Sequence, residues 1–495
     1  MSGQRHRRGD GLVSGWDEYI DVAVVGSGAA GLSAAIEVAQ AGASVVVFEK
    51  MKAIGGNTRI SDGGLAAAGI PQQRSRHIED SPELFLEDMC QAGLDLNHRS
   101  LAAVVAREAA GAVAWTRDVL GVRYLDRLDR FGGHSAARCL TTENHSGADI
   151  IRAQRAQLNQ LGVEIRTGCT MTGLHRDREG AVQGIEIQDR SGSSDGDVGP
   201  ATHVRAAGGV VLATGGFGAD VGFRALQNPR LDATVESTNQ PGATAEGLSS
   251  ALTVGALPVH LSWIQTGPWG CPDERGYGHA ASFASYAVYP TGIVVDPATG
   301  RRIMNEWADR RERSNALFAA GHPCIGLVDA AGAEKAEERL PRLLKRGTVR
   351  AFDTLRDLAA AYEIPAESLV AAVSQYNHRA LGGQEDHFGK PLDRRRGQPI
   401  ETPPFYAVRQ WPKVHYTPGG VGIDVRARVL DLRGRPIPRF FAAGEVCGGV
   451  HGAGRLGSCA LTECIVFGRI AGREAAALPA SLDRANPMTT KRREV

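Results

Sequence analysis

The sequence predicts an α/β protein in which a Rossmann-like nucleotide-binding domain is interrupted by an inserted α+β domain. Three observations lead to this fold class. Residues 19–50 have the pattern of a strand, a glycine turn, a helix and a second strand. A strand, a glycine loop and a helix return at residues 439–476. Between about 260 and 415, charged helical segments, aromatic residues and prolines replace that pattern, which indicates a separate inserted unit.

The first of these segments has the features of a dinucleotide site. Gly26, Gly28 and Gly31 form G-x-G-x-x-G between the strand and the helix, and Glu49 ends the second strand about twenty residues later. Gly26 permits the turn, Gly28 lets a pyrophosphate approach the backbone, and Gly31 lets the helix close on the strand. We expect the helix N-terminus to face the phosphates and Glu49 to accept hydrogen bonds from a ribose.

A second glycine-rich loop, "GGNTRISDGG" at residues 55–64, follows closely. Such a loop suits a cofactor with a bulky isoalloxazine, whereas a nicotinamide does not need one. An ordinary surface loop is the alternative interpretation. The two glycine segments together therefore favour a flavin dinucleotide.

Composition limits the other possibilities. With 56 basic and 55 acidic residues, the net charge of +1 gives no bulk attraction to nucleic acid or to an anionic membrane. The eight cysteines form no C-x-x-C pair, so no metal site is predicted and a reducing cytoplasm is expected. No apolar run approaches the length of about 20 residues that a membrane span needs. Residues 1–16 and 479–495 are expected to be flexible ends, flanking nucleotide-binding segments 17–262 and 416–478 and an inserted substrate or capping domain, 263–415.

One arginine stands out in the C-terminal glycine loop. "HGAGRLGSCAL", residues 451–461, consists mostly of small or apolar residues around Arg455. A guanidinium stays charged at any working pH, and burying it without a partner is costly. We expect Arg455 to bind a carboxylate or a similar oxyanion, and the alternative is an internal salt bridge to Glu445 or Glu463.

Over residues 19–475 the chain resembles the soluble fumarate-reductase-type flavoproteins, a group that includes flavocytochrome c fumarate reductases, urocanate reductase and, more distantly, ketosteroid dehydrogenases. Besides the segments above, the matching motifs are "VVLATGGF", "NEWADRRERS", "HYTPGGVGID" and "AAGEVCGGVHGAGRLGSCAL". The resemblance implies FAD, bound by Gly26, Ser27, Gly28, Ala30, Gly31, Glu49, Lys50, Gly56, Asn57, Thr58, Gly63, Gly64, Thr214, Gly215, Gly216, Gly444, Glu445, Arg455, Ser458, Ala460 and Leu461.

The resemblance also implies how the flavin is held and supplied. Membrane-bound relatives attach it through a histidine, where this chain has Asn57 and Thr58, so non-covalent FAD is expected. The haem domain of the flavocytochromes has no counterpart in this sequence, so a separate electron donor or acceptor is expected.

Two arginines match residues that act on the substrate in these relatives. Arg310, in "NEWADRRERS", matches the arginine that delivers a proton while flavin N5 delivers hydride, and Arg455 matches one that clamps a substrate carboxylate. Tyr416 is a rival proton donor, and His415 or His451 could orient either group. A surface ion pair with Asp309 or Glu306 is the alternative for Arg310.

The chain departs from the family pattern at several polar positions. The histidine that holds the second carboxylate of fumarate aligns with Gly267, and the threonine and glutamate that assist it fall near Ala284 and Ser285. The arginine of the proton relay falls near Val288, and Tyr416 replaces a further histidine. We therefore expect a substrate that is larger and less charged than fumarate. Its predicted pocket comprises Gly267, Trp269, Ser285, Tyr286, Tyr289, His451 and Gly454, although core packing is an alternative for each aromatic residue.

The predicted activity is an FAD-dependent transfer of two electrons across a CH–CH or C=C bond conjugated to a carboxylate or carbonyl. The direction of the reaction stays open at this point. The alternatives are a ketosteroid-type enone dehydrogenase, a flavin electron carrier and a flavin monooxygenase.

Overall fold

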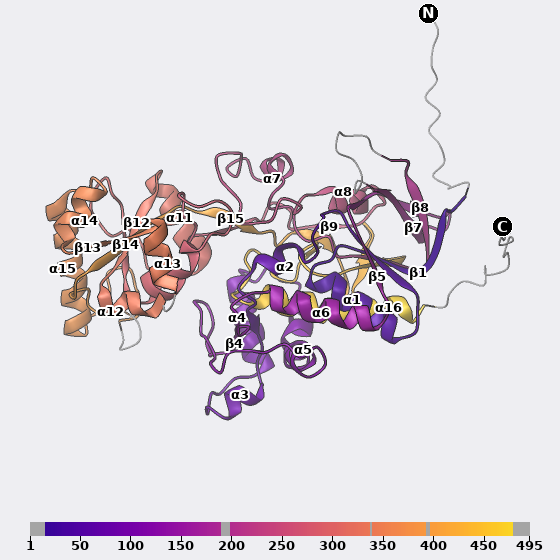
Figure 1. The fold of residues 1–495 in the computed structure, drawn as a ribbon, viewed down its shortest axis with the longest axis horizontal. Helices are drawn as coiled ribbons and strands as arrows, with labels where there is room; N and C mark the ends of the chain where they lie inside the picture. Colours follow the sequence, from indigo (N-terminus) through magenta and orange to yellow (C-terminus); the bar gives the residue numbers. More distant parts are fainter. Residues whose placement is uncertain (1–14, 190–198, 337–338, 393–396, 479–495) are drawn as a thin grey trace, which may run out of the picture.

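A computed structural model describes residues 15–189, 199–336, 339–392 and 397–478. The predicted flexible ends, 1–16 and 479–495, lie outside the described residues apart from Gly15 and Trp16. Two lobes of unequal size make up the molecule (Figure 1). The larger contains both ends of the described chain, and the smaller is formed by the middle of the sequence. The predicted fold class is confirmed.

A mostly parallel sheet forms the centre of the larger lobe. Its central strand, β1 (Glu18–Val25), pairs in parallel with β2 (Val45–Glu49) on one side and with β8 (Thr202–Leu212) on the other. A strand from near residue 440 extends the same sheet, which unites the two segments that the sequence separates. The order is β17 (Arg428–Leu430), β18 (Pro436–Ala442), β8 (Thr202–Leu212), β1 (Glu18–Val25), β2 (Val45–Glu49) and β5 (Glu164–Thr167), with β6 (Cys169–Arg176) and β7 (Val182–Asp189) forming an antiparallel branch from β8.

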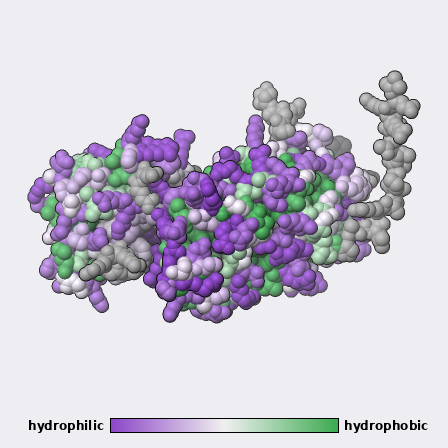
Figure 2. Space-filling view, turned by 60° about the horizontal axis from the view of Figure 1, so that its bottom comes forward, coloured by the Kyte–Doolittle hydropathy of each residue, from purple (hydrophilic) through white to green (hydrophobic). Residues whose placement is uncertain are grey.

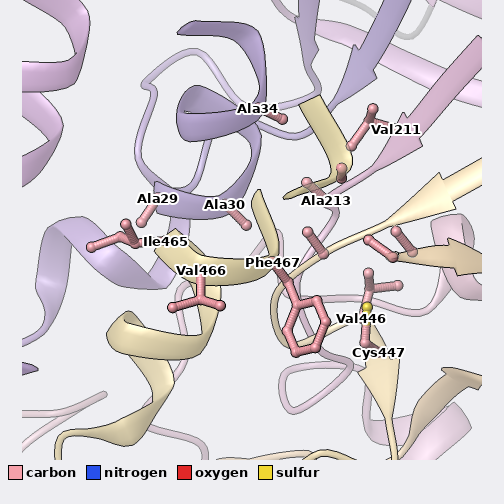
Figure 3. Packing of buried hydrophobic residues seen from close by; sticks show 14 of the residues in the cluster. Ala29, Ala30, Ala34, Val211, Ala213, Val446, Cys447, Ile465, Val466 and Phe467 are labelled. Atoms are coloured by element: carbon pink, nitrogen blue, oxygen red, sulfur yellow. The ribbon is translucent and has the colours of Figure 1, made fainter. Parts of the chain in front are cut away.

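Two helices pack against each other beside this sheet, although more than 400 residues separate them. These are α1 (Ala29–Gln40) and α16 (Cys459–Ala476). A Cβ at Gly468 or Gly472 would collide with the α1 backbone at Ala30 or Ala34, so glycine is required for this close approach. In Figure 3, Ala29 and Ala30 of α1 lie next to α16, with Ile465 of α16 beside Ala29. Helix α16 thereby fixes the glycine loop that precedes it.

Other elements complete the larger lobe. Residues 82–92 and 99–118 form two helices, and residues 148–160 form a third. The elements are α2 (Gly56–Ile60), β3 (Leu65–Ala66), α3 (Pro71–Arg74), α4 (Pro82–Ala92), α5 (Arg99–Asp118), β4 (Cys139–Leu140), α6 (Ala148–Gln160), α7 (Val221–Gln227), α8 (Glu246–Thr253), β9 (Pro258–Val259), β16 (Gly420–Gly422) and β19 (Cys447–Gly448).

The smaller lobe is a four-stranded antiparallel sheet with helices. Its strand order is β11 (Ile293–Val295), β12 (Cys324–Val328), β14 (Phe405–Gln410) and β13 (Val349–Phe352). Separate apolar clusters contain alternate residues of these strands, so each face of the sheet has its own core. The helical segments are α9 (Ala280–Phe283), a π-helical turn (Ala284–Val288), α10 (Tyr289–Thr291), α11 (Arg310–Ala320), α12 (Ala330–Ala333), a 3₁₀ turn (Glu334–Ala336), α13 (Arg339–Arg346), α14 (Leu355–Ala361) and α15 (Ala366–Gly382).

The chain enters and leaves the smaller lobe through two paired strands. These are β10 (Gln265–Gly267) and β15 (Lys413–Tyr416), which run antiparallel with Gln265 opposite Tyr416. The boundary predicted at residue 263 lies two residues before β10, and the one at residue 415 lies within β15. Hydrophilic residues cover much of the surface around the junction (Figure 2). Among the described residues, no helix is both long and apolar enough to cross a bilayer.

Candidate active site

The βαβ turn opens into a cavity at the carboxyl ends of the central strands. Gly26 has a φ of +104°, which favours glycine, and a Cβ there would collide with the carbonyl of Ala213. A Cβ at Gly31 would collide with the carbonyl of Gly26, so this glycine allows the close helix–strand contact. Gly28 has open space on its cavity side, where the nearest atom to an added Cβ lies 3.9 Å away. These are the backbone features that a pyrophosphate requires.

Glu49 lies in the wall of this cavity at the end of β2. Its carboxylate accepts hydrogen bonds from the backbone N–H of Ser27 at 3.0 Å and of Met51 at 2.8 Å. Lys50 is also in the wall and forms a 2.8 Å ion pair with Glu246. The acidic residue is therefore held at the end of the glycine turn, where a ribose would lie.

A second, larger cavity of about 1170 Å³ lies between the two lobes and shares wall residues with the first. Asn57, Thr58 and Glu445 belong to both walls, so the two cavities form one continuous trough. Of the predicted cofactor residues, the first cavity is lined by Gly26, Ser27, Gly28, Ala30, Glu49, Lys50, Asn57, Thr58, Thr214, Gly215, Gly444 and Glu445, and the second by Gly64, Arg455, Ser458, Ala460 and Leu461.

Four of the predicted cofactor glycines lie outside the described walls of both cavities. A Cβ at Gly31, Gly63 or Gly216 would meet Gly26, Thr142 or Thr417, respectively, while Gly56 begins α2 with a φ of +48°. Gly31, Gly63 and Gly216 therefore shape the loops around the trough. The residues that do line the trough fit FAD, because a glycine-lined channel leads into a wide cavity and the buried Thr214 hydroxyl there has no hydrogen-bond partner among the described residues.

Arg455 lies in the wall of the larger cavity and is 7% exposed. Its Nη1 donates to the carbonyl of Leu456 at 3.1 Å, and its guanidinium lies 4.8 Å from the ring centre of Tyr416. Its Nε has no acceptor among the described residues. Neither Glu445 nor Glu463 forms an ion pair with it among the described residues, so the internal salt bridge considered from the sequence is absent there.

His415 links Arg455 to Thr238. Its Nε2 lies 3.1 Å from Nη2 of Arg455, and its Nδ1 lies 2.8 Å from the hydroxyl of Thr238. Because a guanidinium can only donate, Nε2 must be the acceptor and Nδ1 must carry the proton. Burial and the two cations Arg455 and Arg310 hold the pKa of His415 well below its usual range. The imidazole is therefore neutral and fixes the orientation of Arg455.

Arg310 begins helix α11 and projects into the same cavity. Its guanidinium lies 4.6 Å from the ring centre of Trp269, and its Nη1 has no acceptor among the described residues. Burial, together with repulsion from Arg455 and Arg313, lowers the pKa of Arg310 to about 9. A cationic donor with a lowered pKa beside a cavity is a candidate general acid.

The surface ion pairs considered for Arg310 are not formed among the described residues. Asp309 is the N-cap of α11, where its side chain accepts from the Glu312 N–H at 2.9 Å. Glu306 is fully buried and pairs instead with Arg302 at 2.6 Å. Both carboxylates are thus committed to the folding of this segment, which leaves Arg310 available to a ligand.

Tyr416 lies beneath Arg455 and is 5% exposed. Burial, with the nearby carboxyl groups of Glu463 and Glu445, raises the pKa of Tyr416 well above its usual range. His451 packs edge-on against the tyrosine ring at 5.7 Å, and burial lowers the pKa of His451 to about 3. Tyr416 thus keeps its proton strongly, which favours Arg310 over Tyr416 as the proton donor.

The predicted substrate residues divide into two groups. Trp269, Ser285, Tyr286 and Tyr289 line the larger cavity. Gly267, His451 and Gly454 lie outside its described wall. Gly267 leaves space for the indole of Trp269, because an added Cβ would lie only 2.9 Å from that ring.

Several residues of the cavity were missed in the sequence prediction. Tyr277 is half-buried, and its ring lies 6.0 Å from the His415 ring. Desolvation raises the pKa of Tyr277, while Arg310 and Arg455 act in the opposite direction. Arg313, one helical turn after Arg310, lies 4.2 Å from the ring centre of Tyr289. The i, i+3 spacing in "RRER" could have identified Arg313, and the clustering of aromatic residues in the inserted domain could have identified Tyr277. No sequence signal indicated Thr238.

The fold and this trough define a dinucleotide-binding flavoprotein with an inserted lobe over its active site. Residues 21–461 match the family model described as "FAD binding domain". The chain is 38% identical over 465 residues to the acrylate reductase flavoprotein subunit of Shewanella woodyi, spanning 92% of this chain and 91% of the relative. It is 33% identical to the urocanate reductase of Eggerthella lenta, spanning 93% and 75%.

Solved structures agree with this assignment. The open conformation of a flavocytochrome c3 fumarate reductase superimposes with a TM-score of 0.77 at 32% identity, covering 94% of this chain and 79% of that one. A 3-ketosteroid-Δ4-(5α)-dehydrogenase from Rhodococcus jostii RHA1 shares the fold, with a TM-score of 0.73 at 24% identity over 94% and 98%.

The chain therefore belongs to the FAD-binding family of fumarate-reductase-type flavoproteins. It is an FAD-dependent oxidoreductase of the type that acts on carbon–carbon double bonds. The family, the cofactor and the enzyme class predicted from the sequence are thus confirmed.

Proposed function

We propose that this enzyme reduces the C=C bond of an α,β-unsaturated monocarboxylate that is larger than fumarate. The observation that supports this most directly is a set of three buried N–H donors without acceptors among the described residues: Nε of Arg455, Nη1 of Arg310 and Nε1 of Trp269. A carboxylate only accepts hydrogen bonds and has about four lone-pair sites, so it can satisfy such donors.

The size and lining of the cavity support a substrate with one carboxylate and an apolar body. Aromatic rings of Trp269, Tyr277, Tyr286 and Tyr289 line it beside the arginines. The position expected to hold the second carboxylate of fumarate is occupied by Gly267, which has no side chain, and by the indole next to it. A second carboxylate there would be buried without a counter-charge, which is costly. Acrylate, named in one relative, also carries a single carboxylate, so it supports the charge of the proposed substrate but not its size.

Each residue has a distinct task in this reaction. Arg455, oriented by His415, binds the carboxylate and stabilises the negative charge that develops on its oxygens. When bound, FAD supplies the two electrons as a hydride to the β-carbon. Arg310 gives a proton to the α-carbon, and the neutral Tyr416 supports the guanidinium of Arg455 from below.

The binding of FAD and the supply of electrons are part of the same proposal. Residues 57 and 58 are Asn and Thr, which lack the imidazole to which flavin is covalently attached in membrane-bound relatives. FAD is therefore held non-covalently. A separate donor reduces it. All eight cysteines are free thiols, which supports a cytoplasmic location. An electron carrier without substrate chemistry would have no use for Arg310 and Arg455, two arginines in the cavity wall that form no ion pair among the described residues.

A substrate panel tests the proposal. Photoreduced enzyme is mixed anaerobically with acrylate, longer 2-enoates, fumarate, urocanate and a cyclic enone, and the return of oxidised-flavin absorbance is followed. We expect 2-enoates to react at least about tenfold faster than fumarate and their saturated acids to be the products. Fumarate or the enone as the fastest substrate would contradict the assignment.

The Arg455→Gln variant tests the carboxylate site. Losing one partner of a buried charged pair costs about 2–5 kcal/mol, so the KM for the 2-enoate should rise at least about thirtyfold while FAD stays bound. The control is Arg311→Gln, because Arg311 is an exposed residue of α11 that is not among the described residues lining the cavity. An unchanged KM in Arg455→Gln would show that the carboxylate binds elsewhere.

A further inference from the structure

We propose that His175, Glu186 and His203 form a binding site for one divalent transition-metal ion of the Zn²⁺ type. The site lies on the antiparallel branch β6–β7–β8 of the larger lobe (Figure 1). None of the three residues lines the described walls of the FAD trough, so this proposal is independent of the proposed activity.

The strand register places the three side chains on one face of the sheet. Glu186 on β7 is directly opposite His203 on β8. His175 on β6 is opposite Gly184, which precedes Glu186 by two residues. Because side chains two residues apart on a strand point to the same face, all three project together.

The distances agree with a common ion. Nε2 of His175 lies 3.0 Å from Nδ1 of His203, and the three ligand atoms all lie within 4.8 Å of one another. Zn²⁺ binds histidine nitrogen and carboxylate oxygen at about 2.1 Å, so neighbouring ligands of a tetrahedral site are separated by about 3.4 Å. Only small rotations of the side chains are needed to reach that separation.

The surroundings orient the ligands and shield them from solvent. The Thr172 hydroxyl donates to Oε1 of Glu186 at 2.5 Å, which leaves the other carboxylate oxygen for an ion. The indole of Trp16 lies edge-on to His175 with ring centres 5.5 Å apart. Gly184 allows the Trp16 indole to lie this close to the sheet, because a Cβ at residue 184 would lie 2.7 Å from the indole. All three ligands are half-buried.

The donor set selects the class of ion. Two imidazoles and one carboxylate suit Zn²⁺ and similar borderline metals, whereas Mg²⁺ and Ca²⁺ prefer oxygen ligands. The spacing of the three residues along the sequence, 11 and 17 positions apart, matches no familiar zinc motif. The site depends on the pairing of three strands.

An ion here would clamp the strand that forms part of the FAD trough. Cys169, Thr170 and Met171 on β6 line the first cavity, and His175 follows on the same strand. Linking β6 to β7 and β8 through a metal should therefore resist the opening of that wall and slow the loss of FAD.

Metal titration of the chelator-treated, FAD-loaded full-length protein tests the proposal. We expect one equivalent of Zn²⁺ to bind with a micromolar or lower Kd and Mg²⁺ at the same concentration not to bind. His175→Gln and Glu186→Gln should each weaken the binding at least about tenfold. His378→Gln, which changes an exposed histidine on α15, is the control and should bind Zn²⁺ as the wild type does.

Thermal melting provides a second measurement in case a variant is poorly folded. One equivalent of Zn²⁺ should raise the Tm of the wild type and of His378→Gln, but not that of His175→Gln or Glu186→Gln, with FAD content measured in each. Absence of stoichiometric Zn²⁺ binding to the wild type would overturn the proposal. Binding that is unchanged in both ligand variants, or equal binding of Mg²⁺, would also overturn it.

Discussion

Replacing Arg310 with glutamine removes the group that we assign as the proton donor. The Arg310 guanidinium is buried against Trp269, and its Nη1 has no acceptor among the described residues. A positioned general acid typically contributes a factor of about 10²–10⁴ to the rate. We therefore expect the rate of C=C reduction to fall by about that factor, while FAD content and the affinity for the 2-enoate change only severalfold.

The pH dependence gives a second and more specific expectation. Burial and the neighbouring arginines lower the pKa of Arg310 to about 9. The donor is the cation, so kcat/KM, which reports the free enzyme, should be constant at neutral pH and should fall as the pH rises through about 9. In Arg310→Gln this fall should disappear, because the residual reaction no longer depends on that proton.

The assay is anaerobic stopped-flow oxidation of the reduced enzyme by a 2-enoate between pH 6 and 10. Arg311→Gln is the matched control, since Arg311 is the exposed neighbour that lies 3.6 Å from Asp309. A rate for Arg310→Gln within about threefold of the wild type would refute the reasoning. So would a decline near pH 9 that persists unchanged in that variant.

Two further predictions concern groups around Arg455 and the trough. Thr238→Val removes the acceptor for Nδ1–H of His415, so the KM for the 2-enoate should rise about three- to tenfold with a smaller effect on kcat. Thr238→Ser should keep the KM near that of the wild type. An equal rise of KM in both variants would contradict the positioning role of Thr238. Burial, and secondarily Glu445, raises the pKa of Glu463 to about 8. The folded protein thus keeps a proton that the unfolded chain releases near pH 4.5, so the free energy of unfolding should fall by about 1.4 kcal/mol per pH unit up to pH 8. Between pH 6 and 9, the Tm of Glu463→Gln should change less with pH than the Tm of the wild type. Equal changes of Tm with pH in the two proteins would contradict this.

The sequence by itself determined the nucleotide-binding unit and its cofactor class. Gly26 permits a tight turn, Gly28 leaves space for a pyrophosphate, and Gly31 allows a close contact between helix and strand. Each of these roles depends on residues that are near the glycine in the sequence. Glu49 follows from the length of one helix and one strand. Arg455 could be recognised because a charged residue among small ones needs a partner wherever that loop lies. These signals are local, so they can be read without knowing the fold.

Only the tertiary structure decided which groups meet. Thr238 reaches His415, and Tyr277 lies near both arginines, because strands and helices far apart in the chain converge between the lobes. By sequence, Asp309 and Glu306 were plausible ion-pair partners of Arg310. In the structure, Asp309 accepts a hydrogen bond from the backbone N–H of Glu312, and Glu306 pairs with Arg302. The proposed metal ligands come together through strand register alone. Contacts of this kind depend on packing and pairing across long sequence separations, which no local pattern encodes.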